Sequence, residues 1–76
     1  MEKYMILLCH TDNKQMVMDA LMDANQYELV NHNSMVDCWY EVGDTLEEQA
    51  ATDLLVNANA QLLEEHYGIK CEILNY

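Results

Sequence analysis

The chain has 76 residues, of which 51% are hydrophobic and none is proline, and its 14 acidic residues against 3 basic ones give a formal net charge of -11. This composition excludes a multidomain protein and a disordered acidic tail. A surface of this charge also repels nucleic acid and anionic membranes, and it attracts basic proteins or cations. We therefore expect one folded domain over residues 1–76.

The first expected element is a strand over residues 4–9, where every position is apolar. A strand that is apolar on both faces lies in the middle of a sheet. A helix is expected next over residues 13–25, with Thr11 and Asp12 as its capping residues. Its predicted buried face consists of Val17, Ala20, Leu21 and Ala24, which recur at helical spacing.

Between residues 27 and 41 the pattern changes from helical to alternating, and Asn33-Ser34 is expected to form a two-residue turn between two strands. Pairing His32 with Met35 places one apolar set of side chains inward. The opposite face then carries Glu28, Val30, His32, Met35, Asp37, Trp39 and Glu41.

The longest periodic segment spans residues 45–67 and predicts one helix. Thr45 and Glu48 have the spacing of a capping box, and Gly68 can adopt the left-handed conformation that ends a helix. The expected buried face consists of Ala51, Leu54, Leu55, Ala58 and Leu62. An alternating segment over residues 69–74 then predicts the last strand.

The predicted order is β-α-β-β-α-β, the ferredoxin-like arrangement. Two right-handed crossovers would place both helices on one face of a four-stranded antiparallel sheet. The first and third strands would be central. Because this name describes topology alone, it does not indicate a function.

Neither catalysis nor a cofactor is predicted. The chain has no HxxxH or CxxC spacing, no calcium-binding loop and no glycine-rich phosphate-binding loop, so we expect no metal, no cofactor and no enzyme activity. The three cysteines, Cys9, Cys38 and Cys71, lie within apolar segments and are expected to be buried thiols in a reducing compartment. No segment is long and apolar enough to span a membrane, and residues 1–3 do not resemble a signal peptide. We expect a cytoplasmic protein, in the host cytoplasm if a phage encodes it.

Several carboxylates occupy positions where they weaken the isolated fold. Asp19 and Asp23 are four residues apart on the first predicted helix, where like charges repel. Glu64 and Glu65 lie in the last turn of the long helix, where the helix dipole opposes negative charge. These positions favour an acidic binding surface over one selected for stability, although a merely solubilising surface is the alternative.

The uncovered face of the sheet is the second candidate surface. Either Tyr4, Ile6 and Leu8 or Met5, Leu7 and Cys9 must point away from the helices. Together with Trp39 they would form an apolar patch rimmed by carboxylates, which is typical of a protein-binding surface. The alternative is that Trp39 only covers its own sheet.

We predict a non-enzymatic interaction protein whose carboxylates occupy the places of nucleic-acid phosphates and block a basic nucleic-acid-binding protein. In size, charge and lack of catalytic motifs the chain resembles the small phage inhibitors of restriction or CRISPR effectors (anti-restriction and anti-CRISPR proteins), a resemblance of composition. The predicted partner-binding residues are Asp19, Asp23, Glu28, Asp37, Trp39, Glu41, Glu64 and Glu65. The alternatives are a ligand-sensing regulatory module that forms a homodimer through the open sheet face, and an antitoxin that neutralises a basic toxin.

Overall fold

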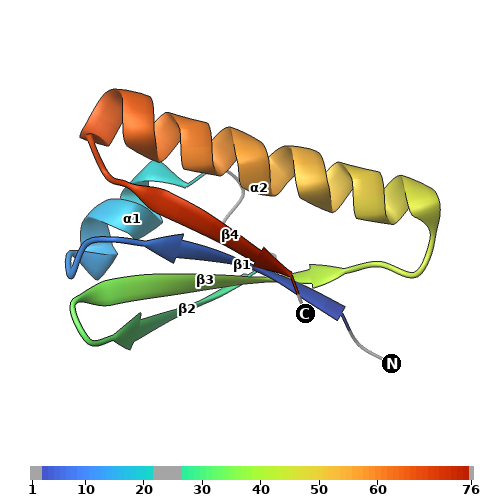
Figure 1. Ribbon diagram of the computed structural model, residues 1–76, viewed down its shortest axis with the longest axis horizontal. Coiled ribbons are helices and arrows are strands. Elements are labelled where there is room, and N and C mark those ends of the chain that lie inside the picture. Colours follow the sequence, from blue (N-terminus) through green and yellow to red (C-terminus); the bar gives the residue numbers. More distant parts are fainter. Residues whose placement is uncertain (1–2, 22–26, 76) are drawn as a thin grey trace.

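The computed structural model describes residues 3–21 and 27–75. It shows an α+β fold in which two helices pack on a four-stranded antiparallel sheet (Figure 1). The elements are β1 (Lys3–Cys9), α1 (Lys14–Ala20), β2 (Tyr27–His32), β3 (Met35–Val42), α2 (Leu46–Tyr67) and β4 (Cys71–Asn75). The strands lie in the order β2-β3-β1-β4, so β1 and β3 are central, as predicted, and β2 and β4 are the edges.

The β2–β3 hairpin has the predicted register. His32 pairs with Met35, and Leu29 lies opposite Cys38. The turn residues Asn33 and Ser34 both have positive φ, at 44° and 61°. This is the backbone that matches a two-residue turn to the twist of its strands. The turn therefore determines which side chains of both strands face the helices.

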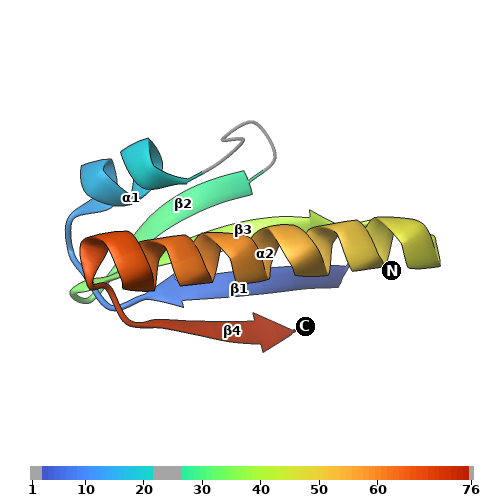
Figure 2. The same ribbon diagram turned by 90° about the horizontal axis from the view of Figure 1, so that it is seen from above.

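The helices cover one face of the sheet. The odd-numbered residues of β1, Met5, Leu7 and Cys9, belong to the same buried cluster as Val17 of α1 and Leu63 of α2. The other set from β1, Tyr4, Ile6 and Leu8, therefore lies on the opposite, open face. Viewed from above, α2 runs along the length of the sheet and α1 lies beside it (Figure 2).

The predicted caps of α2 are present. The Thr45 hydroxyl accepts a hydrogen bond from the Glu48 amide at 3.1 Å and donates one to the Glu48 carboxylate at 3.0 Å. At the other end, Gly68 has φ 66°, and the Ile69 amide donates to the Leu63 carbonyl at 3.1 Å. The 22 residues between these caps span about 33 Å, which equals the longest dimension of the domain, 33 Å.

The predicted buried face of α2 was wrong in part: Leu55 packs against the core and Leu62 is partly buried, but the other three residues are exposed. Leu54 is 72% exposed, and Ala51 and Ala58 are also exposed. The buried residues are instead Val56, Asn59 and Leu63. Apolar side chains occur on more than one side of this helix, so spacing alone does not single out one stripe. The buried stripe also contains an asparagine, which no apolar template would include.

The predicted first helix was too long. Its capping residue is Asn13, whose side chain accepts from the Met16 amide at 3.1 Å, and not Thr11 or Asp12. It ends at Ala20 because Leu21 adopts an extended backbone, with ψ 139°. Val17, Ala20 and Leu21 are buried as predicted, whereas Ala24 lies outside the described residues.

The last strand begins at Cys71, two residues later than predicted, because Lys70 and Ile69 still belong to the connection from α2. Within the described part of the chain, no helix combines the length and the apolar character that crossing a membrane requires.

Candidate functional site

The open face of the sheet consists of rows of side chains that cross the strands. One row runs from Glu72 through Leu8 and Asp37 to Val30. The next runs from Leu74 through Ile6 and Trp39 to Glu28. We call these strand residues, together with Tyr4, Met35 and Glu41, the open face.

Apolar side chains form the centre of the open face. Ile6 is only 3% exposed although it lies outside the cluster under the helices. Its direct cross-strand neighbours are Trp39 and Leu74, and the Trp39 ring meets the Tyr4 ring edge-on at 5.7 Å between centroids. Trp39 therefore covers part of its own sheet. It remains only half-buried, and Leu74 and Val30 at the two edges are 40% and 45% exposed.

Asp37 is the unusual group of this face. It lies on the central strand β3 between Leu8 of β1 and Val30 of β2. Its Oδ1 atom is buried and has no hydrogen-bond partner in the described structure. A buried acceptor without a partner costs about 1–3 kcal/mol, and more when the group is charged. The fold tolerates this cost at a position where an apolar residue would fit its neighbours.

The other carboxylates surround this position. Glu28 and Glu41 are exposed, and each lies next to an aromatic residue, because Glu28 pairs with Trp39 and Glu41 with Tyr4. Asp37 and Glu41 are four residues apart on one strand, a separation of about 13 Å. This spacing is too wide for one metal ion, but it suits two separate cationic side chains.

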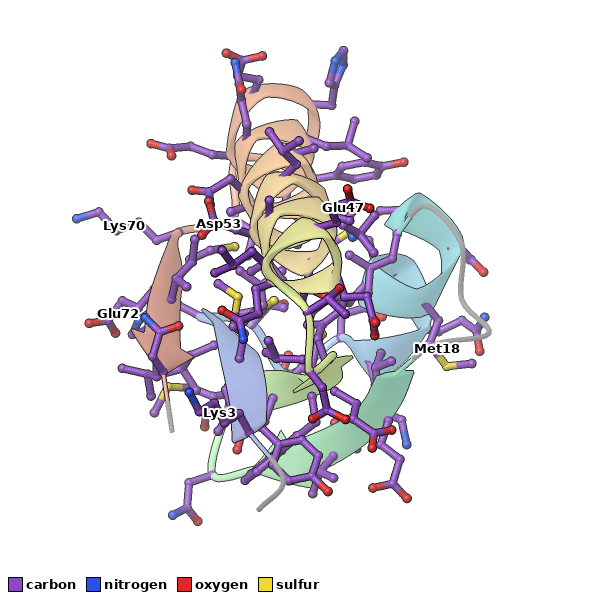
Figure 3. The ribbon with its side chains drawn as sticks, turned by 90° about the vertical axis from the view of Figure 1, so that its right-hand side faces the viewer. Lys3, Met18, Glu47, Asp53, Lys70 and Glu72 are labelled. Carbon is purple, nitrogen blue, oxygen red and sulfur yellow. The ribbon has the colours of Figure 1, made fainter. Side chains whose placement is uncertain are left out.

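Glu72 differs from these carboxylates because it has a partner. Its Oε2 atom lies 2.7 Å from His10 Nε2, and both side chains are largely exposed. In the end-on view Glu72 lies at the outer edge of the sheet, whereas Glu47 and Asp53 belong to the helix layer (Figure 3). The open-face strand positions carry no lysine or arginine.

The structure divides the predicted binding residues between two surfaces. Glu28, Asp37, Trp39 and Glu41 share the open face. Asp19 is on α1 and accepts from Gln15 Nε2 at 2.9 Å, and Glu64 and Glu65 are exposed at the end of α2. These helical acids belong to the layer that covers the other face, so one flat partner surface cannot contact both sets. Asp23 lies outside the described residues.

Two groupings were missed from the sequence. One is a buried hydrogen bond of 3.0 Å from Asn59 Nδ2 to the Tyr40 hydroxyl, between α2 and β3. The other is the meeting of Cys9, Cys38 and Cys71 on the covered face, described below. The cysteine grouping could not be predicted because it depends on the register of β1 with β4. No short turn joins these two strands, so the sequence does not determine their register.

Among residues 3–21 and 27–75, no group of three His, Cys, Asp or Glu side chains is placed to hold an ion.

Comparison of the chain with protein-family models, with curated proteins and with solved structures finds no match.

Proposed function

We propose that the protein is a non-enzymatic inhibitor whose open face binds the cationic groove of a nucleic-acid-binding protein. The observation that carries this proposal is the buried, unpartnered Oδ1 of Asp37 beside the half-buried Trp39. An arginine or lysine of a partner would bind the partly exposed Asp37 carboxylate and supply the missing hydrogen bond once the side chain turns Oδ1 outward. A guanidinium group would also stack on the indole ring.

The charge distribution supports a basic partner. Glu28 and Glu41 are both exposed. Glu28 lies directly opposite Trp39 on the neighbouring strand, and Glu41 lies two residues after Trp39 on the same strand. The open-face strand positions carry no lysine or arginine that would neutralise them. DNA carries about one charge per 1.7 Å of helix axis, so a groove that binds it presents many lysine and arginine side chains. Carboxylates that enter this groove would exclude the nucleic acid while accelerating association.

The apolar centre gives this surface more than charge. Ile6, Trp39 and Leu74 form a continuous apolar row across three strands. Tryptophan is enriched among the residues that contribute most to protein interfaces, especially when the surrounding rim excludes water. The proposed contact thus has an aromatic centre and an acidic rim.

The biological class follows from the same reasoning. Inhibitors of restriction or CRISPR effectors act in the cytoplasm of the infected cell, and a small acidic protein for which the sequence predicts no enzyme activity suits that role. An antitoxin against a basic toxin would use the same chemistry, and the identity of the captured partner distinguishes the two.

Two double variants test the proposed face. Asp37→Lys with Glu41→Lys reverses two open-face charges, and Glu64→Lys with Glu65→Lys reverses two on α2. Each pair changes the formal net charge from -11 to -7. We expect immobilised wild-type protein and the α2 variant to capture a basic nucleic-acid-binding protein from bacterial lysate. We expect the open-face variant to capture at least about tenfold less, the loss of one interaction of about 1.4 kcal/mol.

Two further properties must accompany this capture. Double-stranded DNA should displace the partner, and raising the salt from about 50 mM to 200 mM should weaken binding steeply. Equal capture by both double variants, or binding that is insensitive to salt and DNA, contradicts the proposed mechanism. Circular dichroism of both variants checks that they remain folded.

For the fold itself we propose the ferredoxin-like class. The element order β-α-β-β-α-β, the antiparallel pairing and the central position of β1 and β3 support this assignment. An experimental structure that shows left-handed crossovers would contradict it.

A dimeric, ligand-sensing regulatory module is the second candidate. The exposed Leu74 and Val30 favour it, because a second copy could cover them. A groove of about 460 Å³ between β1 and α2, lined in part by Lys3, Gln49 and Asp53, offers space for a small molecule. Sedimentation of the purified protein distinguishes the candidates: a dimer that Trp39→Ala disrupts favours the regulatory module, and a monomer favours the inhibitor.

A further inference from the structure

Three strands bring the three cysteines of the chain together on the covered face. Cys71 of β4 is the direct cross-strand partner of Cys9 of β1. Cys38 of β3 lies diagonally from Cys9, because Cys38 pairs with Leu7 and Cys9 pairs with Val36. All three are free thiols; Cys9 and Cys38 are buried, and Cys71 is partly exposed.

The Cys9–Cys71 pair has the strand geometry that a disulfide requires. The neighbouring residues His10 and Lys70 are joined by a backbone hydrogen bond of 2.9 Å from the His10 amide to the Lys70 carbonyl. Because hydrogen-bonded and non-hydrogen-bonded pairs alternate along an antiparallel ladder, Cys9 and Cys71 form a non-hydrogen-bonded pair. The Cα atoms of such a pair are about 4.5 Å apart, within the range that disulfides span.

The Cys9 thiol donates to the Leu7 carbonyl and the Cys71 thiol to the Ile69 carbonyl, and the neighbouring thiols influence one another's ionisation. A hydrogen bond with Cys38, together with burial, raises the pKa of Cys9 to about 12, although its hydrogen bond with Cys71 acts in the opposite direction. The hydrogen bond with Cys9, followed by burial, raises the pKa of Cys71 far above its usual range. Both groups are therefore protonated at neutral pH, which slows oxidation and keeps the pair reduced in a reducing compartment.

We propose that Cys9 and Cys71 form a reversible intramolecular disulfide, which joins β1 to the edge strand β4, when the protein meets a peroxide. Peroxide reaches the more exposed Cys71 first, and in the small fraction of molecules whose Cys71 thiol has lost its proton the sulfur attacks one peroxide oxygen. The O–O bond breaks, one water leaves after protonation, and Cys71 becomes a sulfenic acid. The Cys9 sulfur then attacks the Cys71 sulfur, the S–S bond forms, and the sulfenic oxygen leaves as a second water.

The two thiols together lose two electrons and two protons, and the peroxide is reduced to two waters. A thiol such as glutathione reverses the reaction by exchange. The proposal does not depend on the function proposed above, because the cysteines face the helices and the candidate binding residues face away from them.

The bond would change how the fold holds its last strand. Among the strands of residues 3–21 and 27–75, β4 lies at the edge and pairs with β1 alone, so a covalent link to β1 prevents it from detaching. The bond would close a loop of about 60 residues, a length for which a disulfide strongly restricts the unfolded chain. We therefore expect the oxidised form to melt at least about 10 °C higher than the reduced form.

The test treats the purified full-length protein with hydrogen peroxide at mildly alkaline pH and analyses it by intact mass and non-reducing peptide mapping. We expect the loss of two hydrogen atoms, a Cys9–Cys71 link and a higher melting temperature, all reversed by dithiothreitol. Cys38→Ser should keep this behaviour, whereas Cys71→Ser should abolish the mass change and the melting shift.

Three results would overturn the proposal: a Cys9–Cys38 link as the main product, a bond between two chains through Cys71, or three free thiols after prolonged exposure. Peptide mapping of the wild-type protein reports each of them, so the test does not depend on the folding of a variant.

Discussion

On the covered face of the sheet, β3 contributes Tyr40, which is 1% exposed and accepts a hydrogen bond from Asn59 of α2. Three residues earlier on the same strand and on the other face, Asp37 has a buried oxygen without a partner. One strand therefore places a satisfied polar group on one side and an unsatisfied charged group on the other. Tyr40 therefore finds its partner within the chain, whereas Asp37 on the open face has an acceptor that another molecule could engage.

The largest expected effect comes from the covered face. Leu63→Ala should lower the free energy of unfolding by about 3 kcal/mol, because Leu63 is fully buried against the sheet. Leu54→Ala on the same helix is the matched control and should change it by less than about 0.5 kcal/mol, since Leu54 is 72% exposed. Urea unfolding measures both. Equal losses would mean that α2 does not bury the stripe described above.

The next effect concerns the polar pair of the covered face. Asn59→Ala should cost about 2 kcal/mol, because it removes a buried donor and leaves a small cavity. Asn57→Ala is the control: Asn57 is exposed and its side chain donates to the Asp53 carbonyl of its own helix. A loss at Asn59 no greater than that at Asn57 would show that the buried hydrogen bond contributes little to stability.

The smallest effect should have the opposite sign. Asp37→Leu removes the unpartnered carboxylate and places an apolar side chain between Leu8 and Val30, so the isolated protein should gain about 1 kcal/mol. Glu41→Leu is the control, because Glu41 is exposed and its removal relieves no buried charge. Chemical denaturation of the isolated protein decides the sign. A loss of stability for Asp37→Leu would show that the carboxylate has a structural role and would remove the observation that carries the proposed function.

Local signals in the sequence predicted much of the fold. The β2–β3 register follows from alternation together with a two-residue turn, and both ends of α2 follow from Thr45 and Gly68. The buried stripe of α2 did not follow, because Leu54 and Val56 are both apolar and only tertiary packing decides between them. The end of α1 at Ala20, where Leu21 turns extended, also did not follow from helical spacing, since Leu21 fits the apolar pattern of the predicted longer helix.

The candidate site was predictable in part. Alternation placed Asp37, Trp39 and Glu41 on one face, but it gave no indication that Asp37 Oδ1 would be buried between two strands. It also could not place acids of different elements relative to one another, so the helical and sheet carboxylates were predicted as one set of partner-binding residues. Long-range pairing, which sequence spacing does not contain, also brings Cys9 beside Cys71.

The two edge strands of the sheet affect how the protein behaves in concentrated solution. In the described structure β2 and β4 are edge strands, and edges of this kind can pair with those of other molecules and start fibres. Glu28 and Glu72 lie on these two strands, and the net charge of -11 keeps molecules apart. Concentrated salt screens this repulsion, with a Debye length of about 3 Å at 1 M, so the protein stays dispersed best in dilute, low-salt solution.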